Sequence, residues 1–172
     1  MAEAVVRAGR VEDLAAINDI YNHYVLETPA TFEVEPVAMA ARREWFGHCA
    51  ATGRHRLLVA AAGDDVLGYA TSSPYQPRAA YETSVEVSVY LDPASRRQGL
   101  GSRLYAALFA ALEAEDLHRA YGGIAMPNPA SVALHERFGF RQAGYFTEQG
   151  RKFGRYWDVA WFEKPLGAPA EG

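Results

Sequence analysis

The clearest pattern in the chain is a strict alternation of apolar and polar residues that begins after Thr83. The apolar positions share one face of an extended strand, and they are Val85, Val87, Val89 and Leu91. The opposite face carries Glu86, Ser88 and Tyr90. Asp92-Pro93 ends this strand, because proline cannot donate a hydrogen bond to a neighbouring strand. Leucines then recur every four positions from Leu100 to Leu112, which predicts a long amphipathic helix.

Further apolar runs have the length and composition of strands. They lie at residues 5–7, 56–61, 66–72 and 120–125, with two more on either side of a turn at 150–154. The runs at 56–61 and 66–72 should form a hairpin, because a Gly-Asp-Asp turn sequence separates them.

Three other segments show helical spacing of their apolar residues. The first follows Asp13, whose side chain can cap it. The second is expected to begin at Pro36, which suits a first helical turn, and to run toward Ala51. The third, at 132–138, is closed by Gly139. The resulting order, β-α-α-β-β-β-α-β-α-β-β, predicts an α/β fold with a mixed sheet.

Length and composition narrow the class of protein. At 172 residues the chain fits a single domain, with a core at about 4–165 and a frayed C-terminal tail. Its 49% hydrophobic and 22% charged residues are typical of a globular protein. The net charge of −4 gives no support for nucleic acid or an anionic membrane as a partner.

The cysteine and histidine content argues against disulfides and metals. Cys49 is the only cysteine, so the chain has no intrachain disulfide and no cysteine-based metal site. The five histidines show no ligand spacing, and we expect no metal. No apolar run reaches the length of a membrane span and the N-terminus does not resemble a signal peptide, so we expect a cytoplasmic protein.

A glycine-bearing loop joins the central strand to the long helix, with the sequence Arg96-Arg97-Gln98-Gly99-Leu100-Gly101. Two glycines at a helix start let the backbone approach a ligand, and the first-turn N–H groups have no intrahelical acceptors. With two arginines and the helix dipole, the loop suits a phosphate or pyrophosphate. It equally suits a tight strand-to-helix turn with solvated arginines, and it is neither a P-loop nor a dinucleotide fingerprint.

Arg96, Gly99 and Gly101 form the pattern Arg-x-x-Gly-x-Gly, which resembles the acetyl-CoA pyrophosphate signature of the GNAT superfamily of N-acetyltransferases. Asn128-x-x-Ser131 followed by Gly139-Phe140 resembles the second half of that signature. The resemblance spans roughly 4–165 and implies the GNAT fold, a mixed, mostly antiparallel central sheet flanked by helices. It implies that acetyl-CoA is held by Val89, Tyr90, Leu91, Arg96, Arg97, Gln98, Gly99, Leu100, Gly101, Ser102, Asn128 and Ser131. The first three would act through the backbone of a strand that splays from its neighbour.

A closer resemblance is to the phosphinothricin and methionine sulfoximine N-acetyltransferases. The residues that carry it are Ala30-Thr31-Phe32-Glu33, Arg78-x-x-Tyr81, Val85-Glu86-x-Ser88-Val89-Tyr90, Arg97-Gln98-Gly99-Leu100-Gly101, Leu134-His135-Glu136 and Gly150-x-Lys152-x-Gly154. It implies that Glu86 is the general base for the acceptor amine, since only a neutral amine attacks a thioester. From the residues alone, Glu86 fits a solvated strand carboxylate better.

His135 stands where many GNAT enzymes carry a tyrosine that protonates the departing thiolate. It is a candidate acid or second base, and a partly buried packing histidine is the open alternative. Tyr105 is expected in the core. The resemblance implies an acceptor site made of Phe32, Arg78, Tyr81, Glu86, Val87 and Ser88, in which Arg78 grips an acid group through two hydrogen bonds. A solvated loop arginine is the alternative for Arg78.

The expected function is transfer of acetyl from acetyl-CoA to the primary amine of a small amino-acid-like acceptor by direct attack. Cys49 lies far from the signature and is a poor nucleophile candidate. Acetylation of a protein N-terminus or of another metabolite amine, and a non-catalytic acetyl-CoA sensor, remain alternatives. The family match and the aromatic-rich C-terminal strands also predict a homodimer.

Overall fold

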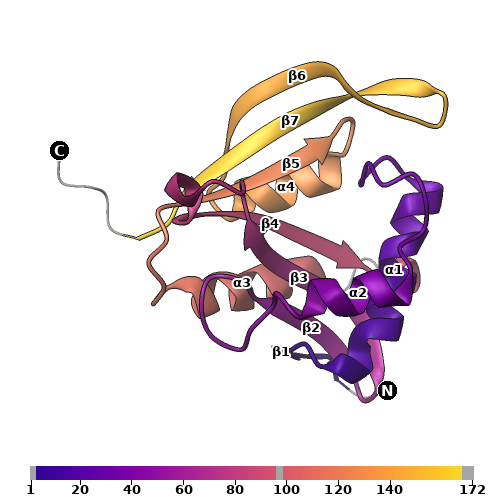
Figure 1. Ribbon diagram of the computed structural model, residues 1–172, viewed down its shortest axis with the longest axis vertical. Helices are drawn as coiled ribbons and strands as arrows, with labels where there is room; N and C mark the ends of the chain where they lie inside the picture. The colour runs from indigo at the N-terminus through magenta and orange to yellow at the C-terminus, as the bar shows by residue number, and fades with distance from the viewer. Residues whose placement is uncertain (1–2, 96–98, 168–172) are drawn as a thin grey trace.

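The computed structural model describes residues 3–95 and 99–167, which build one seven-stranded sheet in the order β1-β2-β3-β4-β5-β7-β6 (Figure 1). The strands are β1 (Val5–Ala8), β2 (Leu57–Ala62), β3 (Asp65–Pro74), β4 (Ser84–Leu91), β5 (Arg119–Ala125), β6 (Arg141–Lys152) and β7 (Arg155–Pro165). All neighbours are antiparallel except β4 and β5. The predicted mixed α/β sheet and the β2–β3 hairpin are confirmed.

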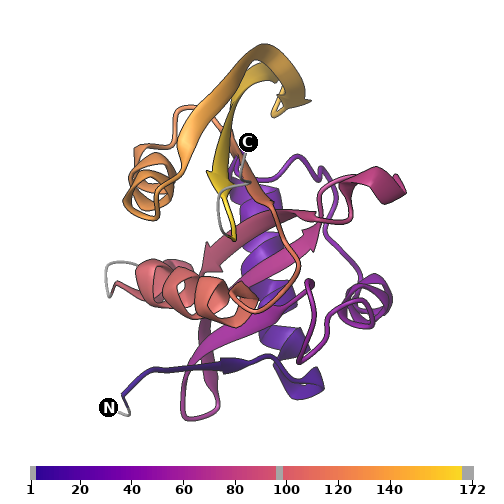
Figure 2. The same ribbon diagram turned by 90° about the vertical axis from the view of Figure 1, so that its left-hand side faces the viewer.

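Helices cover both faces of this sheet (Figure 2). α1 (Leu14–Glu27) and α2 (Met39–Phe46) lie on one face, and α3 (Leu100–Leu112) and α4 (Pro129–Arg137) lie on the other. The strands follow the alternation that the sequence predicts. Val59 and Tyr69 pack with α1, whereas Ala60 and Ala70, their neighbours in sequence, pack with α3. On β4 the same rule sends Val85 and Val87 toward α3, so Glu86 faces the α1 side.

The sheet opens in its middle. β4 pairs with β5 only through Ser84–Glu86 and Arg119–Tyr121, although β4 continues to Leu91. Beyond Glu86, β5 keeps its full register with β7 while β4 keeps its register with β3. The β4 backbone from Val87 to Leu91 therefore borders a gap instead of a strand, which is the splay that the family resemblance implies.

The predicted bounds of the second helix are wrong in detail. α2 begins at Met39 instead of Pro36, because side chains of α1 hold the preceding residues extended: Asn22 Oδ1 accepts from the Val37 N–H at 2.8 Å, and Asn18 Nδ2 donates to the Val37 carbonyl at 2.8 Å. Its C-cap is Gly47, well short of Ala51.

Asp13 precedes α1, as predicted, but its side chain does not cap that helix. Its carboxylate accepts the Arg10 N–H at 2.7 Å and forms a bidentate pair with Arg7 at 2.7 and 2.8 Å. This pair holds the pKa of Asp13 below its usual value. The carboxylate thus ties the short 3-10 turn Val11–Asp13 to β1, which is a contact that spacing along the chain does not reveal.

Candidate active site

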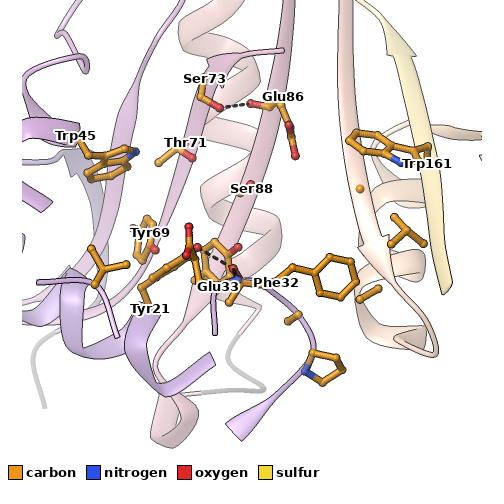
Figure 3. A pocket seen from close by; sticks show the side chains of 18 of the residues that line it. Tyr21, Phe32, Glu33, Trp45, Tyr69, Thr71, Ser73, Glu86, Ser88 and Trp161 are labelled. Atoms are coloured by element: carbon orange, nitrogen blue, oxygen red, sulfur yellow. Dashed lines mark hydrogen bonds between the residues drawn. The ribbon is translucent and has the colours of Figure 1, made fainter. Parts of the chain in front are cut away.

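Two cavities meet at β4. The first, which we call the Glu86 cavity, has a volume of about 740 Å³ and lies on the α1 side of the sheet. Figure 3 shows Glu86 and Ser88 on β4 between Trp45 on one side and Trp161 on the other. The second, the Gly101 cavity, has a volume of about 660 Å³ and is lined by β4, α3 and α4. Six residues line both cavities, namely Pro29, Ala30, Ser88, Tyr90, Gly123 and Ala125. The two cavities therefore adjoin each other at the gap between β4 and β5, where these six residues form a shared wall.

Glu86 projects into the first chamber from the last β4 residue that still pairs with β5. Burial raises the pKa of its carboxyl above the usual 4.5, because the charged form loses its hydration. A carboxylate that is desolvated in this way holds a proton more tightly than one in water, which suits a group that accepts a proton near neutral pH. The outward, solvated strand carboxylate that the residues alone favoured is wrong.

The other residues predicted for the acceptor divide between the cavity and the surface. Phe32 and Ser88 line the Glu86 cavity. Val87 is buried on the opposite face of β4 and lines the Gly101 cavity instead, because its place in the alternation is opposite to that of Glu86. Arg78 and Tyr81 are exposed in and beside the short 3-10 turn Ala79–Tyr81, and neither is among the lining residues of the two cavities.

The helix start behind the glycine loop has the expected form. Gly99 is the N-cap of α3 with φ of +67°, a conformation that side chains disfavour, and Gly101 lines the second cavity. Arg96, Arg97 and Gln98 lie outside the described residues. Leu100 is buried in the core and offers only its backbone, while Ser102 Oγ accepts a hydrogen bond from Arg137 at 3.0 Å.

The remaining cofactor candidates surround the Gly101 cavity. Val89, Tyr90 and Leu91 line it along the open edge of β4, and Asn128 and Ser131 line it from the start of α4. There Asn128 Oδ1 caps the helix by accepting the Ser131 N–H at 3.1 Å. The Tyr24 hydroxyl donates to the Leu91 carbonyl at 2.8 Å, so α1 fixes the end of the open edge.

His135 is buried at the base of the Gly101 cavity with both ring nitrogens in contact with protein atoms. Nδ1 lies 2.8 Å from the Ser131 carbonyl, which can only accept, so Nδ1 carries the proton. Nε2 then accepts from the Tyr105 hydroxyl at 3.1 Å. Burial lowers the pKa of His135 and raises that of Tyr105. An imidazole that is neutral and hydrogen-bonded at both ring nitrogens supports the packing interpretation of His135. Tyr105, which we expected in the core, is fully buried and also lines this cavity.

Several cavity residues escaped the sequence analysis. They are Tyr21, Arg42, Tyr69, Thr71, Ser73 and Trp161, which line the Glu86 cavity from α1, α2, β3 and β7. No feature of the sequence indicates that Arg42 lines a cavity, because an arginine in a charged helical segment usually faces water. Only the docking of α2 against α1 turns it inward.

The described residues offer no metal site, no cysteine in either cavity and no helix that could span a membrane. No group of three or more His, Cys, Asp or Glu side chains there is placed to hold a metal ion. Cys49 is a free, half-buried thiol whose pKa is raised by burial, and it lines neither cavity. Within residues 3–95 and 99–167, no helix is long and apolar enough to cross a membrane.

Comparison with known proteins gives this architecture a family. The model of the acetyltransferase (GNAT) domain matches residues 6–161, which is most of the chain. The chain belongs to the GNAT acetyltransferase family. Its fold is the GNAT fold, and acetyl-CoA is the co-substrate of the enzymes in this family. The chain is therefore an acetyl-CoA-dependent N-acetyltransferase.

Relatives of this GNAT domain match nearly the whole chain. A phosphinothricin N-acetyltransferase of Streptomyces coelicolor is 58% identical over 167 residues, which cover 96% of this chain and 98% of the relative. An L-methionine sulfoximine/L-methionine sulfone acetyltransferase of Pseudomonas paraeruginosa is 37% identical, with 95% of each chain covered. The crystal structure of a phosphinothricin acetyltransferase from Sinorhizobium meliloti in complex with acetyl-CoA superposes with a TM-score of 0.90 at 34% identity, covering 98% of this chain and 94% of that one.

Proposed function

We propose that this GNAT enzyme acetylates the primary amine of a small amino-acid-like acceptor of the phosphinothricin or methionine sulfoximine type. The observation that carries the proposal is the position of Glu86 in a chamber that shares a wall with a second chamber along the open edge of β4. The acceptor would occupy the Glu86 cavity and acetyl-CoA the Gly101 cavity. The names of the relatives, which act on amino acids or their analogues, support the acceptor class.

Glu86 would remove the proton from the acceptor ammonium, directly or through a water, so that the neutral amine can attack directly. Its raised pKa supports this role, because the proton affinity of a buried carboxylate lies closer to that of the group it must deprotonate. Ser88, which lines both cavities, and Phe32, which lines the Glu86 cavity, would line the acceptor's path. Because His135 already contacts protein through both nitrogens, we assign it to positioning Tyr105 rather than to acid catalysis.

The protein groups that would hold acetyl-CoA are the open β4 backbone at Val89–Leu91, the start of α3 at Gly99–Ser102, and Asn128 with Ser131. A Cβ at Gly99 would have no heavy atom of the described residues within 4 Å, and this space and the edge of β4 that is unpaired with β5 both fit a long ligand that approaches the backbone. The bound co-substrate supplies the activated acetyl group. The assignment of Arg96, Arg97 and Gln98 to its phosphates stays a prediction.

A release assay for free CoA thiol tests the function. The wild-type enzyme is incubated with acetyl-CoA and a panel of phosphinothricin, methionine sulfoximine, ordinary amino acids, a peptide with a free N-terminus and a simple polyamine. We expect release with the first two. Release with the peptide alone would favour a protein N-terminus, and no release with any amine, despite binding of acetyl-CoA, would favour a sensor.

Glu86→Gln tests the base, with Glu113→Gln, an exposed residue at the end of α3, as the matched control. General-base catalysis contributes about two to four decades in rate, so kcat should fall by a comparable factor while acetyl-CoA affinity stays near normal. The control should keep the wild-type rate. A Glu86→Gln rate within about a factor of two of wild type would mean that water accepts the proton.

We further propose that the enzyme is a cytoplasmic homodimer with one domain per chain. Four aromatic side chains on the β6–β7 hairpin, Tyr145, Phe146, Phe153 and Tyr156, are 46–55% exposed. β6 is also the edge of the sheet and is exposed along most of its length, and a long open edge with apolar side chains favours association. Light scattering at micromolar concentration should give a dimer, and Phe146→Ser should weaken it. A fully active monomer would contradict this proposal.

A further inference from the structure

Arg42 is a buried cation in the wall of the Glu86 cavity. Its side chain is only 5% exposed, and it lines the cavity beside Tyr21 and Trp45. The guanidinium carbon lies over each of these two rings, 4.7 Å from the centre of each, so the group makes cation–π contacts with both. Nε donates to Asn18 Oδ1 at 3.0 Å, which fixes the orientation of the planar group. Two aromatic rings and an amide thus hold one arginine in a single position at the cavity wall.

This guanidinium lacks a counterion within the part of the chain that the structure describes. Its Nη2 is buried and has no hydrogen-bond partner, and none of the ion pairs formed by the described residues includes Arg42. A buried charge is costly unless it is paired with an opposite charge and hydrogen-bonded. The carboxylates of Glu33 and Glu86 also line this cavity, and neither is paired with Arg42 in any of the ion pairs of the described residues.

We propose that Arg42 binds an anionic group of the acceptor, either its carboxylate or a phosphinate, and thereby selects acidic acceptors. This inference rests on the proposed function, since it assigns the acceptor to the Glu86 cavity. An acid group would supply the missing counterion, and a planar guanidinium can hold it through two parallel hydrogen bonds. An acceptor held at Arg42 would be restrained inside the cavity that Glu86 also lines.

The other cations near the cavity fit this role less well. Arg78 is exposed and lines neither cavity, so its assignment to the acid group stays a prediction. Lys152 is buried, but its Nζ already donates to the Thr31 carbonyl at 2.7 Å and lies 3.4 Å from the Tyr24 carbonyl. Among the cations that the structure describes, Arg42 is the one that combines burial, a place in the cavity wall and an unpartnered nitrogen.

The test compares acceptors that differ by one charge, within each enzyme variant. The acceptors are phosphinothricin, its carboxamide, which lacks the carboxylate, and methionine sulfoximine, which lacks the phosphinate. The variants are Arg42→Met, which keeps a long side chain next to the two rings, Arg42→Lys and Arg78→Ala, with Arg43→Met on the exposed side of α2 as the control. Ratios of kcat/KM between acceptors are used, because they do not depend on the fraction of each variant that is folded.

We expect Arg42→Met to lower kcat/KM for phosphinothricin by about tenfold to a hundredfold, which is the usual effect of a lost charge-assisted hydrogen bond, and to leave the KM for acetyl-CoA unchanged. The penalty should disappear for the one acceptor that lacks the group held by Arg42: the carboxamide if that group is the carboxylate, methionine sulfoximine if it is the phosphinate. Arg42→Lys should recover part of the loss, and Arg43→Met should match wild type.

If Arg42→Met lowers kcat/KM equally for all three acceptors, Arg42 only packs α2 in place, and the inference is overturned. A selective loss in Arg78→Ala without one in the Arg42 variants would also overturn it, in favour of Arg78. If Arg42→Met does not fold, Arg42→Lys decides, since acceptor ratios identical to those of wild type would rule out a bidentate contact. A wild-type enzyme that acetylates none of the three acceptors would instead contradict the proposed function.

Discussion

Replacing Gly150 by alanine should reshape the Glu86 cavity with little cost in stability. Gly150 lies in β6 opposite Trp157 of β7, and the Phe32 ring packs directly on its Cα. A Cβ built at this position would lie 2.3 Å from Phe32 Cε2 and 2.6 Å from both Cδ2 and Cζ. Since ordinary contact with a Cβ begins at 3.4 Å, the ring must retreat by 3.4 − 2.3 = 1.1 Å.

Phe32 has room to make this movement. Its side chain is 38% exposed, and it stands on the segment between α1 and α2, outside any helix or strand. The alanine itself suits β6, because Gly150 is not among the residues with positive φ. Gly→Ala at such a site stabilises the folded state by about 0.4–1 kcal/mol, because it lowers the conformational entropy of the unfolded chain. The two effects oppose each other, so we expect the free energy of unfolding to change by less than about 1 kcal/mol.

The loss should fall on the acceptor. Phe32 lines the Glu86 cavity, and an apolar wall that withdraws forfeits part of the about 1.5–3 kcal/mol that a large buried side chain contributes. With about 1–2 kcal/mol lost, kcat/KM for the acceptor should fall about fivefold to thirtyfold, while the KM for acetyl-CoA stays unchanged. Steady-state kinetics with each substrate varied in turn, and urea unfolding, measure both effects.

Gly144→Ala is the matched control, because its Cβ would meet Phe146 Cε2 at 3.5 Å, an ordinary contact on the same strand. It should behave like wild type in both measurements. The reasoning is refuted if the kcat/KM of Gly150→Ala for the acceptor stays within about a factor of two of wild type. It is also refuted if the free energy of unfolding falls by several kcal/mol, since the hairpin rather than Phe32 would then have moved.

Three further outcomes follow from the geometry. Gly122→Ala places a Cβ 2.6 Å from His135 Nε2, and because that ring is packed and bonded on both sides, urea unfolding should show a loss of about 2–5 kcal/mol, from overpacking and a broken buried hydrogen bond. Gly101→Val adds bulk next to Leu134, already 3.4 Å from a Cβ there, and we expect a raised KM for acetyl-CoA in a folded protein; unchanged affinity would rule out this helix start as the cofactor site. The raised pKa of Glu86 means that the folded state binds its proton more tightly than the unfolded state, so stability falls as pH rises from 4.5 through the folded pKa. Unfolding midpoints of Glu86→Gln should lack this fall, while wild-type kcat/KM should rise over the same window as Glu86 ionises.

The sequence by itself determined the order of the elements and the two faces of β4. Alternation from Val85 to Leu91 is a local property of an extended chain, so it shows which side chains share a face before any packing is known. The spacing of Leu100 to Leu112 and the glycines before it predict the helix and its start for the same reason. Motifs formed by neighbouring residues therefore sufficed to recognise the family.

Tertiary structure decided what each face meets. Whether Glu86 faced water or a cavity depended on α1, α2 and β7, which come from distant parts of the chain. The inward turn of Arg42 required Asn18 and Tyr21 of α1, the late start of α2 required Asn22, and the bonds of His135 required Tyr105 of α3. Burial and pairing are sums over neighbours that are remote in sequence, so periodicity cannot supply them. The chemistry of the site rests on those sums: a carboxylate with a raised pKa, and a cation that forms no ion pair within the described part of the chain, exist only because the helices close over the sheet.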